Sequence, residues 1–414
     1  MSLKLNSNSI NYNVATVLDL TSIVNPSIND TVVVTEEGRG GVFIYRADGT
    51  SNGGTIFDSS STGKWHRQYE GSVNVKWFGA KGDGVTNDLV PVQNALYFIR
   101  TTQDITSYWY SDKIDSKLLF PSGTYLIDGT LLTLGNVTIK GDGATITSHN
   151  NTTTPVFETC YIAGGIWTSN ALLETSVLLS DAVTNLKFEN LTFRNIGYVF
   201  KLRGAIWQGH ISKCSFYYCG IVCTANNCFY FNYLDIMSFG TKGTISDLVG
   251  KFQLTEANNR ISFDRVSIAH ASSVGAENGI GIQISGGGGD LSITNCSFEI
   301  IRTAIQLTDS FSDFTISSCY FEGLYTIIKD TDGAIKNGFN TTEGGDATPI
   351  IGKYCEFKNL KTGEIIWSVE MHKIFETNPD TFLLTMDNVK NRFHTEERQK
   401  LNTANFSNFE LDAN

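Results

Sequence analysis

The chain has 414 residues and carries 42 Asp and Glu against 31 Lys and Arg, a formal net charge of -11 at pH 7. This balance argues against a nucleic-acid partner, which would need a basic footprint, and favours a neutral or weakly charged ligand. Residues 1–10 lack the apolar core of a signal peptide, and no apolar run reaches the length of a membrane span. We therefore expect a protein without a membrane segment that does not leave the cytoplasm by a signal peptide.

Residues 1–75 are expected to form a small β module. Two apolar runs, residues 31–34 and 42–45, flank a Gly-rich turn and predict a hairpin, and residues 53–57 predict a further short strand. A module this small is more plausibly an attachment piece than a catalytic one.

The next segment predicts an amphipathic helix. Asn87 or Asp88 can serve as its N-cap, and Pro91 falls in the first turn, where a missing N–H is tolerated. Apolar residues then recur at i, i+3, i+4 and i+7, which gives one apolar stripe: Val92, Ala95, Leu96 and Ile99. We expect this helix to cover one apolar end of the body that follows.

A short pattern returns between residues 185 and 360: apolar, two polar residues, Cys or an aliphatic, one polar residue, then Phe or Ile. Because its ending has period 2, each copy predicts a strand rather than a helix. Measured at the fourth position, the steps are 23, 20, 32, 30, 23 and 36 residues. Repeats that cannot bury an apolar face alone must stack. The copies are residues 188–193, 211–216, 231–236, 263–268, 293–298 and 316–321, with a decayed copy that ends at Phe357.

Because the repeats leave no room for helical crossovers, the predicted fold is all-β: a parallel β-helix with a small N-terminal β module and a capping α-helix. The expected domains are residues 1–75 for the module and 76–370 for the β-helix. Residues 371–414 are expected to form a short C-terminal segment.

Cysteine usage favours buried thiols over disulfides. Cys214, Cys296, Cys319 and Cys355 share one inward repeat position, where Cys acts as a small hydrophobe. Four cysteines lie close together in the sequence, at 214, 219, 223 and 228, but their spacing matches no familiar zinc site. We therefore expect neither a metal nor another cofactor.

Three motifs occur in order along the chain: Trp-Phe-Gly-Ala-Lys-Gly-Asp-Gly-Val-Thr-Asn-Asp at 77–88, Phe-Pro-Ser-Gly-Thr-Tyr at 120–125 and Ile-Lys-Gly-Asp-Gly at 139–143. Together they resemble the start of the pectate-lyase-like, right-handed β-helix domain of bacteriophage tailspikes, and the repeat extends this resemblance to about residue 360. Residues 41–45 and 64–69 are similar to virion-proximal segments of the same proteins.

The resemblance implies a homotrimer on the phage tail, joined to tail or baseplate proteins by the N-terminal module. It also implies binding, and usually cleavage, of host surface polysaccharide, outside the cell at the host surface. A phage protein leaves its host by lysis, which agrees with the missing signal peptide. Family spikes usually continue further, so the short segment after residue 370 leaves open a compact spike or a fragment.

Because the family has no fixed catalytic motif, candidate residues come from the repeat itself. The residue after each final Phe or Ile should point outward, and this column contains Arg194, Tyr217, Met237, Ala269, Glu299, Glu322 and Lys358. Glu299 and Glu322 are successive members, so their Cα atoms should lie about 4.8 Å apart. Two carboxylates so close raise one pKa, as a glycosidase acid requires. The alternative is a solvated charge ladder in which Lys358 offsets Glu322.

Two aspartates are further catalytic candidates. Asp235 is expected in a neighbouring outward column with Ser215 and Tyr320, whereas Asp264 follows an inward Phe263 and is equally a turn residue. A sugar site also needs flat aromatic faces and polar neighbours. The substrate-binding candidates are Tyr217, Tyr320, Trp207 and Arg302.

Endo-acting glycoside hydrolysis, with Glu299 and Glu322 as acid and nucleophile or base, is the favoured function. A polysaccharide lyase would instead use a base such as His210 or His270, with Arg or Lys beside a uronate carboxylate. A non-catalytic receptor-binding or adaptor tail protein would use the same surface only to hold glycan or to space other proteins.

Overall fold

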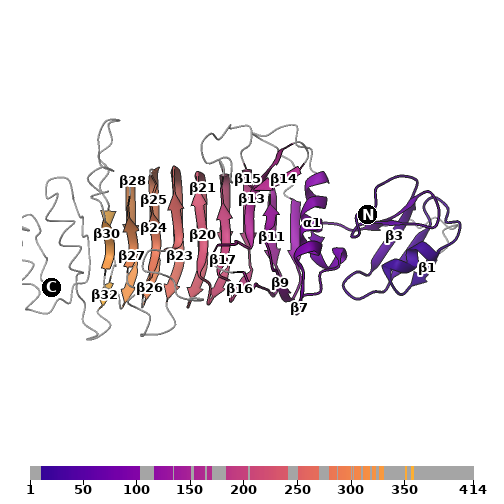
Figure 1. Cartoon of the computed structure of the whole chain (residues 1–414), viewed down its shortest axis with the longest axis horizontal. Helices are drawn as coiled ribbons and strands as arrows, with labels where there is room; N and C mark the ends of the chain where they lie inside the picture. Colours follow the sequence, from indigo (N-terminus) through magenta and orange to yellow (C-terminus); the bar gives the residue numbers. More distant parts are fainter. Residues whose placement is uncertain are drawn as a thin grey trace, which may run out of the picture.

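The structure is a computed structural model in which the chain forms a long stack of parallel strands with a small module at one end (Figure 1). It describes residues 11–102, 116–133, 135–150, 153–163, 166–169, 183–203, 206–240, 250–269, 279–286, 288–299, 301, 303–308, 311–317, 319–322, 326–330, 350–351 and 356–358.

The N-terminal module is a five-stranded sheet with its own apolar core. Its strand order is β1-β2-β3-β5-β4, with β1 parallel to β2 and the other pairs antiparallel. The side chains of Phe43 and Trp65 are fully buried in this core. The predicted hairpin is confirmed as β2 and β3. The elements are β1 (Asn11–Val14), the 3-10 helix η1 (Val17–Ser22), β2 (Thr31–Val34), β3 (Gly41–Arg46), β4 (Ile56–Asp58) and β5 (Lys64–Gln68).

The body is a parallel β-helix, as the repeat predicted. Each full rung, meaning one turn of chain around the axis, gives two strand segments to a larger sheet and one to a smaller sheet. In the rungs that contain β21 and β23, one 12-residue strand supplies both segments of the larger sheet. Neighbouring rungs pair in parallel, so that residues 22 or 30 positions apart become neighbours in these rungs.

The larger sheet contains β6 (Val73–Asn74), β7 (Asp83–Asn87), β8 (Ser116–Phe120), β9 (Gly123–Leu126), β11 (Val137–Gly141), β12 (Ala144–Thr147), β15 (Val183–Glu189), β16 (Thr192–Arg194), β18 (Ile206–Ser212), β19 (Ser215–Tyr217), β21 (Cys228–Phe239), β23 (Asn258–Ala269), β25 (Gly288–Thr294), β26 (Ser297–Glu299), β28 (Phe311–Ser317), β29 (Tyr320–Glu322), β31 (Ile350–Ile351) and β32 (Glu356–Lys358). The smaller sheet contains β10 (Leu131–Thr133), β13 (Phe157–Ala163), β17 (Tyr198–Leu202), β20 (Ile221–Asn226), β22 (Gly250–Thr255), β24 (Ile280–Ile284), β27 (Thr303–Leu307) and β30 (Thr326–Asp330), and β14 (Ile166–Ser169) pairs antiparallel with β13.

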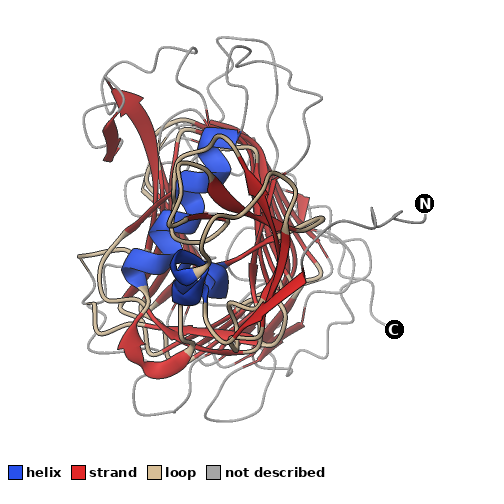
Figure 2. Cartoon of the chain, turned by 90° about the vertical axis from the view of Figure 1, so that its right-hand side faces the viewer, coloured by secondary structure: helices blue, strands red, loops and turns tan. Residues whose placement is uncertain are grey.

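The predicted capping helix is confirmed as α1 (Leu89–Thr102). Its apolar stripe is buried against the first rungs, with Val92, Ala95, Leu96 and Ile99 each no more than 3% exposed. Viewed along the long axis, the strands surround the interior and the helical segments lie across its end (Figure 2). The helix therefore covers apolar side chains that the first rung would otherwise expose to water.

The interior of the body is filled by stacked aromatic rings and thiols. The rings of Phe193 and Phe216 are 5.0 Å apart and nearly parallel, and those of Tyr233 and Phe263 are 4.4 Å apart. The predicted burial of thiols is confirmed at Cys214, Cys219, Cys223, Cys228, Cys296 and Cys319, all of which are free. Cys355 lies outside the described residues.

One copy of the repeat lies two residues later in the structure than the sequence predicts, at residues 233–238. The predicted copy 231–236 put Leu234 opposite Cys214, but the register pairs Ser215 with Met237 and Tyr217 with Phe239, so Ile236 follows Cys214 in the column. The steps are therefore 22 and 30 residues rather than 20 and 32. The error arose because apolar residues satisfy both frames, while the true final apolar position is a buried serine, Ser238.

A corner follows the first strand of each rung and is turned by a residue in the left-handed region. The φ angles are 55° at Asn190, 52° at Lys213, 51° at Asp235, 53° at Arg265 and 55° at Asn295. Asn and Asp tolerate this region better than other non-glycine residues, so three of these five positions carry suitable residues.

The module and the body meet at Arg67, which is 5% exposed. Its guanidinium carbon lies 4.5 Å from the Phe43 ring centre of the module and 4.7 Å from the Trp77 ring centre in η2 (Val75–Phe78) of the body. It also donates hydrogen bonds to the carbonyl oxygens of Arg39, Gly40 and Gly54. Burial lowers the pKa of Arg67 to about 10. One cation thus joins the two apolar cores.

Candidate functional site

Glu299 and Glu322 are direct neighbours on adjacent rungs. They close β26 and β29, which pair in parallel, and their Cα atoms are register partners. Parallel neighbours lie about 4.8 Å apart, so the spacing inferred from the repeat is present in the backbone. The Glu299 side chain is partly exposed, and that of Glu322 lies outside what the structure describes. The catalytic role of the pair stays a prediction.

The corrected register defines the glutamate column, which runs along the outer surface at the end of the second strand of each rung. Its members are Arg194, Tyr217, Phe239, Ala269, Glu299, Glu322 and Lys358. Phe239 replaces Met237, which instead lies between Ser215 and Ser267 in the next column.

Aromatic side chains and one cation gather at the start of the glutamate column. The guanidinium of Arg194 lies 5.1 Å from the ring centre of Tyr217. The ring of Tyr218, which is 41% exposed, meets Phe239 edge to face at 6.2 Å. Three register steps separate Tyr217 from Glu299, about 14 Å along the stack. Such partly exposed rings can contact the C–H faces of sugars that lie along the column.

Tyr320 lies two residues before Glu322 on β29 and is partly exposed. Its register partner on the preceding rung is Ser297, whose hydroxyl donates to the Ser267 hydroxyl at 2.8 Å. Tyr320 therefore shares a strand with Glu322, and its role in substrate binding stays a prediction. Arg302 lies outside the described residues.

Asp235 is not in the column with Tyr320, which corrects the prediction. It occupies a corner with φ 51° and accepts a hydrogen bond from Arg265, which lowers the pKa of its carboxyl group. A carboxyl group held ionised in this way is poorly suited to act as a general acid.

Asp264 is held by the same arginine and by the next rung. Its carboxylate accepts hydrogen bonds from Arg265, from the Thr294 hydroxyl at 3.2 Å and from the Asn295 amide at 2.9 Å. These contacts tie adjacent corners together and agree with the turn-residue alternative for Asp264.

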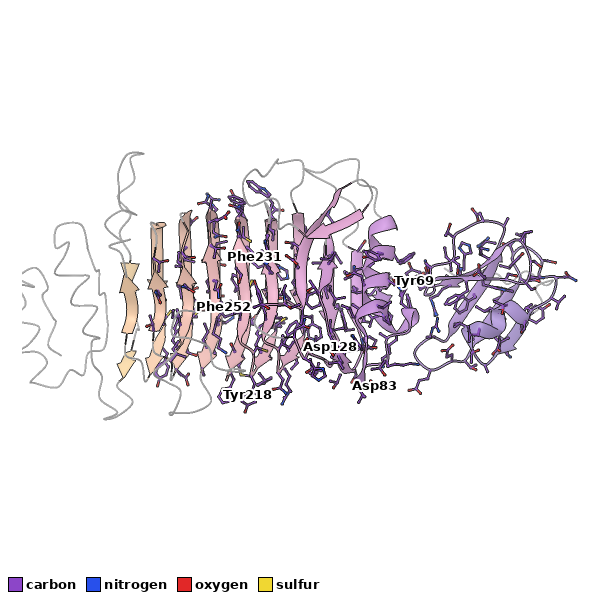
Figure 3. The ribbon with its side chains drawn as sticks, in the orientation of Figure 1. Tyr69, Asp83, Asp128, Tyr218, Phe231 and Phe252 are labelled. Carbon is purple, nitrogen blue, oxygen red and sulfur yellow. The ribbon has the colours of Figure 1, made fainter. Side chains whose placement is uncertain are left out.

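Trp207 lies at the opposite end of the rung from the glutamate column. Its ring stacks on Phe229 at 4.8 Å, and both residues stand near the start of their strands, whereas Phe239 ends β21. In Figure 3, Phe231, two residues after Phe229, lies towards the upper edge of the body and Tyr218 at the lower edge. The structure therefore does not bring Trp207 to the glutamate pair.

A histidine–glutamate pair lies on the outer surface of the larger sheet, with Glu189 on β15 and His210 on β18. His210 Nε2 is 2.9 Å from Glu189 Oε1, and the register partner of His210 on the preceding rung is Lys187. Sequence reasoning named His210 as a lyase base but missed its carboxylate partner, because the contact joins residues 21 positions apart. His270 lies outside the described residues.

The described part of the chain contains no group of three or more His, Cys, Asp or Glu side chains that could hold a metal ion. Within those same residues, no helix is long and apolar enough to cross a membrane.

Comparison with known families gives two matches. Residues 72–329 match the family described as rhamnogalacturonase A/epimerase, pectate lyase-like. Residues 13–70 match the phage tail protein small four-stranded β-sheet domain. No curated protein sequence matches the chain.

Solved structures with a similar course of the chain include three of phage or bacterial-surface origin. The ORF18 protein of Geobacillus virus E2 is 18% identical, with 84% of this chain and 71% of that chain covered and a TM-score of 0.48. The tailspike of Acinetobacter baumannii phage AM24 is 13% identical, with coverages of 82% and 64% and a TM-score of 0.43. The Streptococcus pneumoniae adhesin PfbA is 13% identical, with coverages of 70% and 80% and a TM-score of 0.47.

Proposed function

The chain belongs to the rhamnogalacturonase A/epimerase, pectate lyase-like family and carries an N-terminal phage tail β-sheet domain, and from this premise we propose that it is a phage tailspike that binds and cleaves host surface polysaccharide. The reaction proposed is endo-acting glycoside hydrolysis at Glu299 and Glu322. The observation that carries it is the in-register pairing of these two residues on β26 and β29.

The neighbours in the column favour one assignment of roles. Glu322 has Lys358 as its register partner on the next rung, whereas Glu299 has Ala269 on the preceding one. A lysine at the adjacent register position favours the ionised form of a carboxylate, which is the form a nucleophile needs. Glu299 is therefore the proposed acid that protonates the glycosidic oxygen, and Glu322 the proposed nucleophile.

The spacing of the rungs favours a retaining reaction. Retaining glycosidases place their two carboxyl groups about 5 Å apart, and inverting enzymes hold them roughly 6.5–9.5 Å apart. Cα atoms about 4.8 Å apart on adjacent parallel strands suit the shorter separation. The attack of Glu322 would then form a covalent glycosyl-enzyme, which water hydrolyses with Glu299 as base.

The remaining column supplies the binding surface. A polysaccharide that lies parallel to the stack would meet Arg194, Tyr217 and Phe239 before it reaches the two glutamates. The rings offer apolar faces, and the guanidinium offers donors to hydroxyl groups. Tyr320, on the same strand as Glu322, completes the surface beside the reacting bond.

The assembly belongs to the same proposal. Residues 1–75 would join the spike to tail or baseplate proteins, residues 76–370 would act on the glycan, and residues 371–414 would stabilise a homotrimer. Such a protein is part of the virion tail and acts outside the cell at the host surface.

β-Elimination is the second candidate function, and the His210–Glu189 hydrogen bond favours it. A carboxylate that orients an imidazole is a usual arrangement for a general base, and Lys187 on the adjacent rung is placed to neutralise a uronate carboxylate. The two reactions give different products. Elimination creates an unsaturated sugar that absorbs ultraviolet light, and hydrolysis does not.

The test uses purified capsular and O-antigen polysaccharides with release of reducing ends as the readout. We expect Glu299→Gln and Glu322→Gln each to lower the rate at least a hundredfold, since positioned acid–base groups contribute about 10²–10⁴. Glu256→Gln, which alters an exposed turn carboxylate, is the matched control and should leave the rate unchanged. Unchanged turnover in both variants would discard the assignment, and binding without shortening of the glycan would support the receptor-binding alternative.

A further inference from the structure

A stack of aromatic side chains lies on the outer surface of β18 and β21. The ring of Trp207 is 4.8 Å from that of Phe229 and 6.0 Å from that of Tyr230, with interplanar angles of 19° and 28°. The guanidinium of Arg260 lies 5.0 Å from the Tyr230 ring centre, and Arg260 in turn pairs with Asp290 at 3.4 Å. We call Trp207, Phe229 and Tyr230 the aromatic ladder.

The aromatic ladder is not part of the interior. In β18 and β21 the inward positions are taken by Ile206, Cys228 and Phe231, which are fully buried. Trp207 and Phe229 are partly exposed, and Tyr230 is 42% exposed. Three large rings are therefore in contact with water. The fold does not require rings at these positions, because the register partner of Phe229 on the next rung is the polar and exposed Asn259.

The backbone at the aromatic ladder adopts a conformation that its residues disfavour. The φ angles are 56° at Gln208, 56° at Tyr230 and 54° at Arg260, and the corresponding residues on the outer rungs, Asn185 and Asp290, are of the types that tolerate this region. Because this angle recurs at the same register position on five successive rungs, it is a regular bend of the strands, and it turns the side chains of Tyr230 and Arg260 towards solvent.

The strand beneath the aromatic ladder is tightly seated. A Cβ atom on Gly209, between Trp207 and His210, would lie 2.6 Å from the Leu186 carbonyl oxygen and 2.6 Å from the Phe231 ring. Glycine at this position lets β18 lie directly on the interior rings, so the outward side chains on either side of it have a rigid base. A rigid, preformed surface loses little entropy when it binds a ligand.

The polar groups around the aromatic ladder carry little net charge. Arg260 is balanced by Asp290, and His210 is bonded to Glu189. Asn232 on β21 and Asn259 on the next rung add amide donors and acceptors. Flat apolar rings with a hydrogen-bonding and nearly neutral rim match a pyranose, whose C–H face packs on a ring while its hydroxyl groups bond the rim.

We propose that the aromatic ladder is a second glycan-binding surface, separate from the glutamate column, which holds neutral or weakly charged pyranose units of the same polysaccharide. Phe229 and Phe239 stand ten residues apart on β21 and lie less than about 33 Å apart, because the strand turns at the Asp235 corner between them. A long glycan can thus contact both sites, and a short one only one of them. The inference rests on the proposed function only in that the ligand is a glycan.

The test measures binding in the Glu299→Gln background, so that cleavage does not deplete the ligand. The probe is an array of bacterial capsular and lipopolysaccharide glycans, followed by titration of the polysaccharide that binds most tightly. We expect Trp207→Ala and Tyr230→Ala each to weaken binding about tenfold, or about 1.4 kcal/mol. Trp207→Phe, which keeps a ring, should restore most of the loss. Tyr97→Ala, an equally exposed tyrosine on α1, is the control and should bind like the parent.

Cleavage by the unmodified protein, measured in parallel, separates the two proposals. If Trp207→Ala binds within twofold of the control while the parent releases reducing ends, the second surface is refuted and the proposed hydrolysis stands. If binding depends on Trp207 while no reducing ends appear, the hydrolysis is refuted and the second surface stands. A parent protein that binds no glycan on the array refutes both.

Discussion

Asp88 offers a sharp test of how the end of the β-helix is closed. The residue has no exposed surface, and its carboxylate accepts hydrogen bonds from the backbone N–H groups of Lys81 at 2.6 Å and Gly82 at 3.0 Å. Its own backbone carbonyl accepts from Val92 in the first turn of α1. Asp88 therefore holds the turn before β7 through its side chain and the start of the capping helix through its backbone.

The structure allows the loss on mutation to be worked out. Each hydrogen bond to a charged group is worth about 1.5–3 kcal/mol, so Asp88→Ala removes roughly 3–6 kcal/mol of interaction. Burial raises the pKa of Asp88, so part of this is offset by relief of an unfavourably buried charge. We expect a net loss of about 2–4 kcal/mol, which lowers the melting temperature of a chain of this length by roughly 2–5 °C. Asp88→Asn, which keeps one acceptor, should lose about half as much.

Thermal unfolding followed by intrinsic fluorescence measures this loss, and the urea midpoint gives an independent check. Asp83→Ala is the matched control, because Asp83 also accepts backbone N–H groups, from Val85 and Thr86, but is exposed to solvent. It should melt much closer to the parent than Asp88→Ala does. If Asp88→Ala melts within a degree of the parent, or if Asp83→Ala loses more, the carboxylate does not hold the cap and the reasoning is wrong.

Three further outcomes follow from contacts in the module, the junction and the interior. Arg67→Met should leave three carbonyl oxygens without their donor and make the chain near Trp77 more open to limited proteolysis; unchanged cleavage would contradict a rigid junction. Phe216→Ala should cost about 3–5 kcal/mol, measured as a lower urea midpoint, because a fully buried ring leaves a cavity. Raising the pH from 9 to 10 should lower the free energy of unfolding by roughly 2 kcal/mol. In this pH range only the unfolded chain releases the protons of the Cys214, Cys223 and Cys228 thiols, which lowers the free energy of unfolding by about 3 kcal/mol. Lys251 acts in the opposite direction, because burial lowers its pKa to about 8 and only the unfolded chain keeps its proton; this raises the free energy of unfolding by about 1 kcal/mol. A urea midpoint that does not move would contradict the burial of these thiols, since burial raises the pKa to about 12 at Cys214 and Cys223 and well above 9 at Cys228.

The β-helix could be predicted from the sequence because its signal is local and repeated. Period-2 endings such as the one at Phe216 require only a few residues to be recognised, and the stripe of α1 likewise lies within one segment. The copy near Phe231 was misplaced because Tyr233 and Ile236 fit two frames and Ser238 occupies an interior position. Strand β5 carries polar residues between its buried ones, which made it hard to recognise as a strand.

Some features of the candidate site could likewise be predicted from the sequence, and others could not. The proximity of Glu299 and Glu322 could be predicted because they occupy the same position in consecutive copies. The place of Phe239 in the column and the pairing of His210 with Glu189 could not, since both depend on the register between rungs of unequal length. Segments between strands set those lengths, and their composition does not encode which residues become neighbours.

The cation at the junction has a mechanical consequence. Because the guanidinium of Arg67 is clamped between Phe43 and Trp77, the module and the rod-like body cannot swivel freely about residues 69–72. A torque applied to the body would be passed to the module through these two ring contacts. The rotational position of the body about its long axis, relative to the module, would then be fixed at the joint.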